Sequence, residues 1–181
     1  MLQNAARKVL TTYLSEGRIP ALSEIGIGES EYARSKDPVF VTLYKDGKVV
    51  ASSGRIHTKN ENTAKEMVEN ALLCLKDSRL SGLVGTAADL QNVRIRVDVL
   101  PASKRRVLAN ISALDTKKEG VIFLAQGLGK LSVVLPNVAN LTDKAEDLLS
   151  IAIQKTGLDP KSLKEGDYVV YGIQTEAMSD F

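Results

Sequence analysis

The sequence is poor in the residues that build metal and redox sites. Its 181 residues include one histidine, one cysteine and no tryptophan, and its only aromatic residues are three phenylalanines and five tyrosines. A Cys/His zinc site needs three or four such ligands and a disulfide needs two cysteines, so the chain alone can form neither. A mechanism that needs two histidines is excluded for the same reason. We therefore expect no metal site and no bound cofactor.

Strong charge and long apolar runs are also lacking. Lys and Arg total 24 against 22 acidic residues, and a net charge of +2 is too weak to indicate a nucleic-acid partner. No apolar run approaches the roughly 18 residues that span a membrane. The first ten residues are amphipathic and lack the continuous apolar stretch of a signal peptide. A single cysteine suits a reducing compartment. We expect a soluble cytoplasmic protein.

The organisation is that of an ordinary globular chain. Hydrophobic residues make up 44% and charged residues 25%, without low-complexity tracts or flexible linkers. The length suits one domain over residues 1–181, or two closely packed lobes.

Periodicity predicts a mixture of helices and strands. Apolar spacing predicts helices over about residues 3–16, 62–78 and 142–157. The second helix carries Thr63 and Glu66 at the spacing of a capping box. Segments rich in β-formers predict strands at 39–44, 48–53, 93–99, 121–125, 131–135 and 167–175. Hairpin-length connections, such as Asp46-Gly47, make this an α+β fold with a mainly antiparallel sheet and about three helices.

The polar segment after the first predicted hairpin is the main candidate site. It contains Ser52, Ser53, Gly54, Arg55 and His57. A hydrolase would use a serine as nucleophile and His57 as base. Residues four apart in a strand are about 13 Å apart, at ~3.3 Å per residue, so this requires a sharp bend at Gly54. Alternatively, the Gly-containing turn and Arg55 could hold an anion.

Two further features have a structural and a functional interpretation. Cys74 lies on the second predicted helix, where a buried structural thiol is the default. Strand 93–99 alternates apolar and charged residues, which predicts a half-buried strand with Arg94, Arg96 and Asp98 on its outer face. A basic patch is a candidate RNA surface, but a solvated sheet face is the favoured explanation, because stacking aromatics and a recognisable RNA-binding module are both missing. The patch consists of Arg94, Arg96, Lys104, Arg105 and Arg106.

Several short motifs occur in the order typical of a known family. The sequence resembles the AMMECR-one domain family, named after a human chromosomal region linked to Alport syndrome, midface hypoplasia and elliptocytosis. The resemblance covers nearly the whole chain. It rests on the opening Ala6-Arg7 helix, Phe40-Val-Thr-Leu43 followed by Asp46-Gly47, Asp77-Ser-Arg79-Leu80, the strand Ile95–Leu100, Glu119-Gly-Val-Ile122, Leu135-Pro-Asn-Val-Ala139 and Lys155-Thr-Gly-Leu158.

The chain departs from this family at its signature hexapeptide, Leu-Arg-Gly-Cys-x-Gly. The aligned residues are Val49 to Gly54, in which Val50, Ala51 and Ser52 replace the Arg, the first Gly and the Cys. The resemblance therefore implies a diverged member that lacks any chemistry of that Cys or Arg. The positions that match the family are Gly54, Arg79 and Pro136, with Asn137 in place of its usual Gln.

The resemblance implies partners but no reaction, because the activity of the domain is not established. It suggests a role beside Memo-type and radical-SAM proteins. Three hypotheses follow. The first is a binding or scaffold domain with its site near residues 49–57, extended to Arg79 and Asn137. The others are an enzyme that uses residues 52–57 and an RNA-associated module that uses the basic patch.

Overall fold

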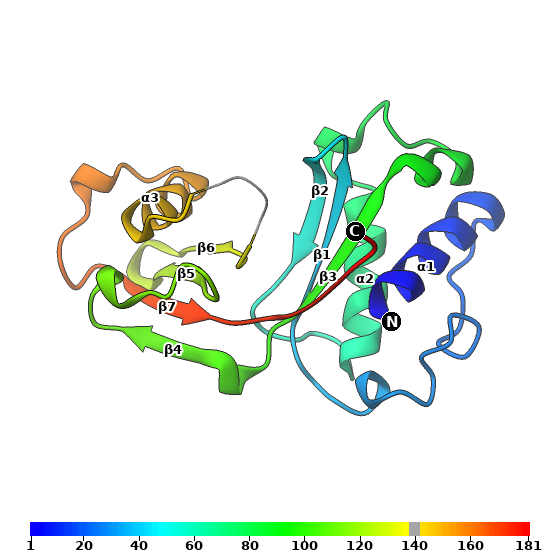
Figure 1. Cartoon of the computed structure of the whole chain (residues 1–181), viewed down its shortest axis with the longest axis horizontal. Coiled ribbons are helices and arrows are strands. Elements are labelled where there is room, and N and C mark those ends of the chain that lie inside the picture. The colour runs from blue at the N-terminus through cyan, green and yellow to red at the C-terminus, as the bar shows by residue number, and fades with distance from the viewer. Residues whose placement is uncertain (138–141) are drawn as a thin grey trace. The chain divides into compact units, whose positions relative to one another are not determined.

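A computed structural model describes residues 1–137 and 142–181 (Figure 1). Within these residues the chain forms two compact units. Unit 1 comprises Met1–Leu100 and Glu176–Phe181, and unit 2 comprises Pro101–Thr175. The chain therefore leaves unit 1, builds unit 2 and returns to unit 1 for its last strand.

Unit 1 contains a four-stranded sheet in the order β2-β1-β3-β8, with antiparallel pairing throughout. Asp46 and Gly47 both adopt positive φ, at 51° and 75°, in the tight turn that was predicted between β1 and β2. The strands are β1 (Val39–Lys45), β2 (Lys48–Gly54), β3 (Arg94–Val99) and β8 (Glu176–Ser179).

Two helices, α1 (Leu2–Glu16) and α2 (Thr63–Cys74), pack on one face of this sheet and lie side by side in Figure 1. Their apolar stripes meet the alternate strand residues that point the same way, and this burial stabilises unit 1. The shared core includes Leu2, Ala6, Val9, Leu10, Val41, Leu43, Met67, Ala71, Ile95 and Val97.

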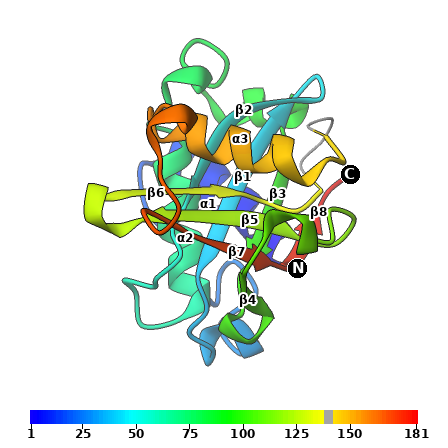
Figure 2. The same cartoon turned by 90° about the vertical axis from the view of Figure 1, so that its left-hand side faces the viewer.

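Unit 2 contains a second antiparallel sheet in the order β4-β7-β5-β6, covered on one face by α3 (Figure 2). Its core includes Val121, Phe123, Ala125, Leu148, Ala152, Ile153 and Val170. The elements are β4 (Arg105–Leu108), β5 (Gly120–Ala125), β6 (Lys130–Val134), α3 (Ala145–Lys155) and β7 (Val169–Ile173).

The predicted fold class is confirmed: the described residues form an α+β fold with three α-helices and antiparallel sheets. The predicted capping box is wrong. Asn62 is the N-cap of α2 and accepts the N–H of Lys65 at 2.9 Å, while Thr63 accepts the N–H of Asp37 at 2.8 Å. Strands β4 and β8 were not predicted. None of the helices in the described part of the chain is long and apolar enough to cross a membrane.

Two helix boundaries also differ from the prediction. Helix α2 ends at Cys74, and a separate 3-10 turn, Ser78–Leu80, follows it. Helix α3 begins at Ala145, with the extended Lys144 as its N-cap, and the hydroxyl of Thr142 accepts the N–H of Lys144 at 3.1 Å in the turn before the helix.

Candidate functional site

The two serines of the signature segment point to opposite faces of β2. Ser53 pairs with Val41 and faces α2, where its hydroxyl donates to Oδ1 of the fully buried Asn70 at 2.8 Å. The amide nitrogen of Asn70 donates in turn to the carbonyl of Glu66 at 2.9 Å. The Ser53 hydroxyl therefore joins β2 to α2.

Ser52 lies opposite Thr42 on the other face of the sheet, with their hydroxyl oxygens 3.3 Å apart. Its backbone N–H points away from β1 and donates to Oδ2 of Asp77 at 3.1 Å. The Arg79 guanidinium binds both oxygens of Asp77, at 3.0 and 2.7 Å, and this pairing holds the pKa of the Asp77 carboxyl well below its usual range. The Asp77-x-Arg79 motif thus covers the outer edge of the signature strand.

Gly54 is the one signature residue that matches the family, and Phe40 explains why glycine stands there. The two residues are cross-strand partners. A Cβ atom at position 54 would overlap the Phe40 ring. The glycine therefore leaves room for the ring to lie across the end of the strand.

Arg55 does not offer a free anion site. Its guanidinium lies 3.1 Å from the Glu69 carboxylate and 3.6 Å from that of Glu66. Glu66 is fully buried and also accepts the backbone N–H groups of Lys59 and Asn60. A ligand anion would have to compete with two carboxylates, so the geometry disfavours the anion-binding hypothesis.

His57 is exposed, and in the described residues no hydrogen bond joins it to Ser52 or Ser53. The physical reason is that β2 continues as an extended strand through Gly54 instead of bending sharply. The geometry therefore provides no serine–histidine pair.

Cys74 is buried beneath β1, and its thiol donates to the carbonyl of Val41 at 3.3 Å. Burial raises the pKa of the thiol to about 12. The sulfur is therefore protonated at neutral pH and is not a nucleophile.

The remaining candidates are divided between the units. Arg79 is half-exposed in unit 1. Asn137 belongs to unit 2, where it follows β6 with a positive φ of 52°. Val138 and Ala139, the last residues of the family motif at 135–139, lie outside the described residues.

The basic patch is likewise divided, with Arg94 and Arg96 in unit 1 and residues 104–106 in unit 2. The prediction that Arg96 and Asp98 lie on a solvated face is wrong. Both are buried, and the Arg96 guanidinium binds the two Asp98 oxygens at 2.8 and 2.7 Å. Arg106 is committed to the buried Glu119, with two contacts of 2.7 Å. The Arg96 and Arg106 charges are therefore neutralised within the fold.

Four residues that organise the site were not among the predicted site residues, namely Thr42, Glu66, Asn70 and Asp77. A carboxylate and an amide on the apolar face of a helix, at positions 66 and 70, were a detectable signal, because buried polar groups need partners. Thr42 carried no comparable signal. The described residues contain no group of three His, Cys, Asp or Glu side chains that could hold a metal ion.

Comparisons with known proteins agree with the resemblance seen in the sequence. The AMMECR1 family model matches residues 3–178. Protein CA_C1420 of Clostridium acetobutylicum is 36% identical over 158 residues, which is 85% of this chain but only 31% of that relative. The crystal structure of the uncharacterised protein PH0010 from Pyrococcus horikoshii has the same fold, with a TM-score of 0.79 and 19% identity over 98% of this chain and 89% of that one.

Proposed function

The chain belongs to the AMMECR1 family, and from the geometry of its signature strand we propose that it is a non-catalytic binding domain with a contact site around residues 52–57. One observation carries this proposal. The hydroxyls of Ser52 and Ser53 and the thiol of Cys74 all have hydrogen-bond partners inside unit 1.

These partners cannot activate a nucleophile. They are a threonine hydroxyl, a side-chain amide oxygen and a backbone carbonyl, and none of these groups takes a proton at neutral pH. A serine nucleophile is usually activated by a general base within hydrogen-bond distance, and a cysteine by a base or a lowered pKa. The polar signature residues therefore support the strand and the loop after it, and the side chains available for contact are exposed ones such as His57.

The catalytic alternative is tested with a serine-reactive fluorophosphonate probe. We expect neither Ser52 nor Ser53 to be labelled when the intact protein is analysed by mass spectrometry. Labelling of either serine that is lost in His57→Ala would overturn the proposal in favour of an enzyme.

Binding is tested by site-specific photo-crosslinking in the native host. A photoreactive phenylalanine analogue replaces either His57 or Ser15, an exposed residue at the end of α1 that serves as the control. We expect a discrete protein adduct from position 57 and none from position 15. Equal products from both positions, or no product from position 57, would contradict a contact site here.

A further inference from the structure

Residues 176–181 return to unit 1 after the whole of unit 2 and complete its sheet. Within this segment, β8 pairs antiparallel with β3, from Ser179 opposite Arg96 to Glu176 opposite Val99. The other edge of β3 pairs with β1, so β8 is an edge strand of the sheet. We call residues 176–181 the strap.

Asp180 fastens the strap to two other elements. Its Oδ2 accepts a hydrogen bond from the Arg7 guanidinium of α1 at 2.5 Å. Its Oδ1 accepts the backbone N–H of Ile95 at 2.8 Å, and its own backbone N–H donates to the Ile95 carbonyl at 3.2 Å. One aspartate therefore ties the strap to both α1 and β3.

The receiving side of this contact is built without the strap. The Arg7 guanidinium also donates to the carbonyls of Leu90 and Val93, at 2.7 and 2.6 Å. Both carbonyls belong to the segment that leads into β3, and they remain in place when the strap leaves. The guanidinium is therefore positioned for a carboxylate on whichever strand lies along this edge.

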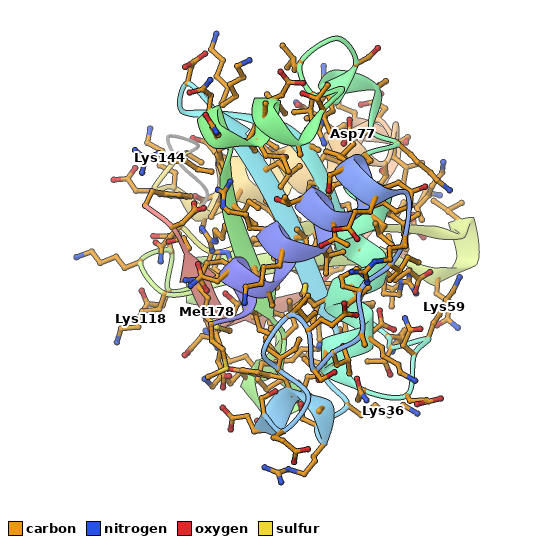
Figure 3. The ribbon with its side chains drawn as sticks, turned by 90° about the vertical axis from the view of Figure 1, so that its right-hand side faces the viewer. Lys36, Lys59, Asp77, Lys118, Lys144 and Met178 are labelled. Carbon is orange, nitrogen blue, oxygen red and sulfur yellow. The ribbon has the colours of Figure 1, made fainter. Side chains whose placement is uncertain are left out.

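Two side chains of the strap add apolar contacts. Met178 packs against the core of unit 1, and Figure 3 shows it at the margin of this unit, beside α1. The Phe181 ring meets the Tyr44 ring edge-on, with ring centroids 5.2 Å apart. The edge thus recognises an extended strand that carries an apolar residue, an aspartate and an aromatic residue at positions 178, 180 and 181.

The strap is held less tightly than the strands beside it. Glu176 and Ala177 are exposed, and Phe181 is 57% exposed. The Arg7 and Asp180 side chains are 32% and 22% exposed, so their ion pair is partly screened by water. Release of the strap is therefore a local opening that leaves the remainder of unit 1 folded.

The connection to the strap is short. Only Gln174 and Thr175 separate the end of β7 in unit 2 from the start of β8 in unit 1. Short hinges favour the exchange of an element between two copies of a protein. A strap from a second copy makes the same contacts with Arg7, Ile95 and Tyr44, so the balance is set by the connector and by protein concentration.

We propose that two copies of this chain exchange their straps and form a dimer, in which Asp180 of each copy binds Arg7 of the other. The partner is a second copy because the strap already fits this edge in every contact described above. The exchanged contact lies along β3 and α1, whereas residues 52–57 lie on and after β2, which β1 separates from β3. The inference is therefore independent of the proposed function.

The direct test replaces Phe181 by a photoreactive phenylalanine analogue, which keeps an aromatic ring beside Tyr44. Full-length copies with and without ¹⁵N are mixed, concentrated and irradiated, and mass spectrometry separates crosslinks within one copy from those between copies. We expect crosslinks between copies from position 181 to the segment around Tyr44. Their ratio to crosslinks within one copy should rise about tenfold for a tenfold rise in monomer concentration.

The control places the same analogue at Ser15, an exposed residue at the far end of α1. It should give no specific crosslink between copies. Crosslinks from position 181 that stay within one copy at every concentration would overturn the exchange. So would crosslinks between copies that are as frequent from position 15 as from position 181.

Charge reversal gives a second test. Arg7→Glu and Asp180→Lys each place like charges together within a single copy. In a mixture of the two variants, exchange restores both ion pairs, since the introduced glutamate meets the introduced lysine and Arg7 meets Asp180. We expect light scattering to find monomers for each variant alone and dimers for the mixture.

The double variant Arg7→Glu/Asp180→Lys is the matched control, because it restores opposite charges within one copy and shows by thermal unfolding whether the reversed pair suits the fold. A mixture that stays monomeric while the double variant is folded contradicts the exchange. If the single variants fail to fold, the crosslinking at position 181, which changes no charge, decides the question.

Discussion

The backbone N–H of Ser52 donates to the side chain of Asp77 at 3.1 Å, across 25 residues of sequence. Strand β2 is an edge strand, and its unpaired backbone groups could recruit another strand. The Asp77 carboxylate, which is itself bound by Arg79, accepts a hydrogen bond from one of these backbone N–H groups. This contact links two family motifs and stabilises the edge of the signature strand.

Asp77→Asn should reduce the free energy of unfolding by about 1–2 kcal/mol at neutral pH, because the charged hydrogen bonds of the carboxylate are lost. The loss is not larger because Arg79 is exposed, and an exposed ion pair contributes little. The pKa of Asp77 is depressed in the folded protein, with the Arg79 side chain as the main cause. Its stabilisation is therefore complete above the usual carboxyl pKa of about 4 and is lost as pH falls below it. Urea denaturation at several pH values should show that the difference in the free energy of unfolding between variant and parent becomes smaller in acid. A difference that does not change with pH would contradict this role.

Gly54→Ala should destabilise unit 1 by about 1–3 kcal/mol, because the new methyl group overlaps the Phe40 ring. Gly127→Ala is the control, since no atom lies within 4 Å of its added Cβ. The double variant Phe40→Ala/Gly54→Ala should show a coupling energy that offsets part of the two separate losses. If the stability losses of the two single variants, measured by thermal unfolding, simply add in the double variant, the Phe40 ring is not the reason that position 54 requires glycine.

Cys74 should resist thiol reagents in the folded protein. Burial raises its pKa to about 12, so the reactive thiolate is scarce even at mildly alkaline pH. Titration with a chromogenic disulfide reagent should detect one thiol in denaturant and react only slowly without it. Rapid reaction of the native protein would show that the sulfur is accessible and ionised.

Arg106→Gln should destabilise unit 2 by about 1–3 kcal/mol, because the buried Glu119 loses its counter-charge. Lys118→Gln is the control, since its ion pair with Asp115 is long and exposed. Equal unfolding midpoints for the two variants would contradict a structural role for Arg106. A mutational test of RNA binding should therefore leave Arg106 unchanged.

The elements that the sequence predicted have strong local signals. The hairpin of β1 and β2 follows from β-branched residues on both sides of Asp46-Gly47, and α1 follows from apolar spacing that ends at Gly17, whose φ is 69°. Strands β4 and β8 have four residues each, and two of the four in β8 are polar. Their pairing is decided by β7 and β3, the strands beside which they lie.

The candidate site, like the fold, was predicted only in part from the sequence. Composition alone excluded a Cys/His zinc site and a disulfide within the chain, and the family motifs located the signature segment, because both depend only on which residues are present and in what order. Only the tertiary structure decided what those residues do. Ser53 meets Asn70, Arg55 meets Glu66 and Glu69, and Arg96 turns inward to Asp98. Most of these contacts join segments distant in sequence, and all depend on burial and strand register, which a linear pattern does not specify.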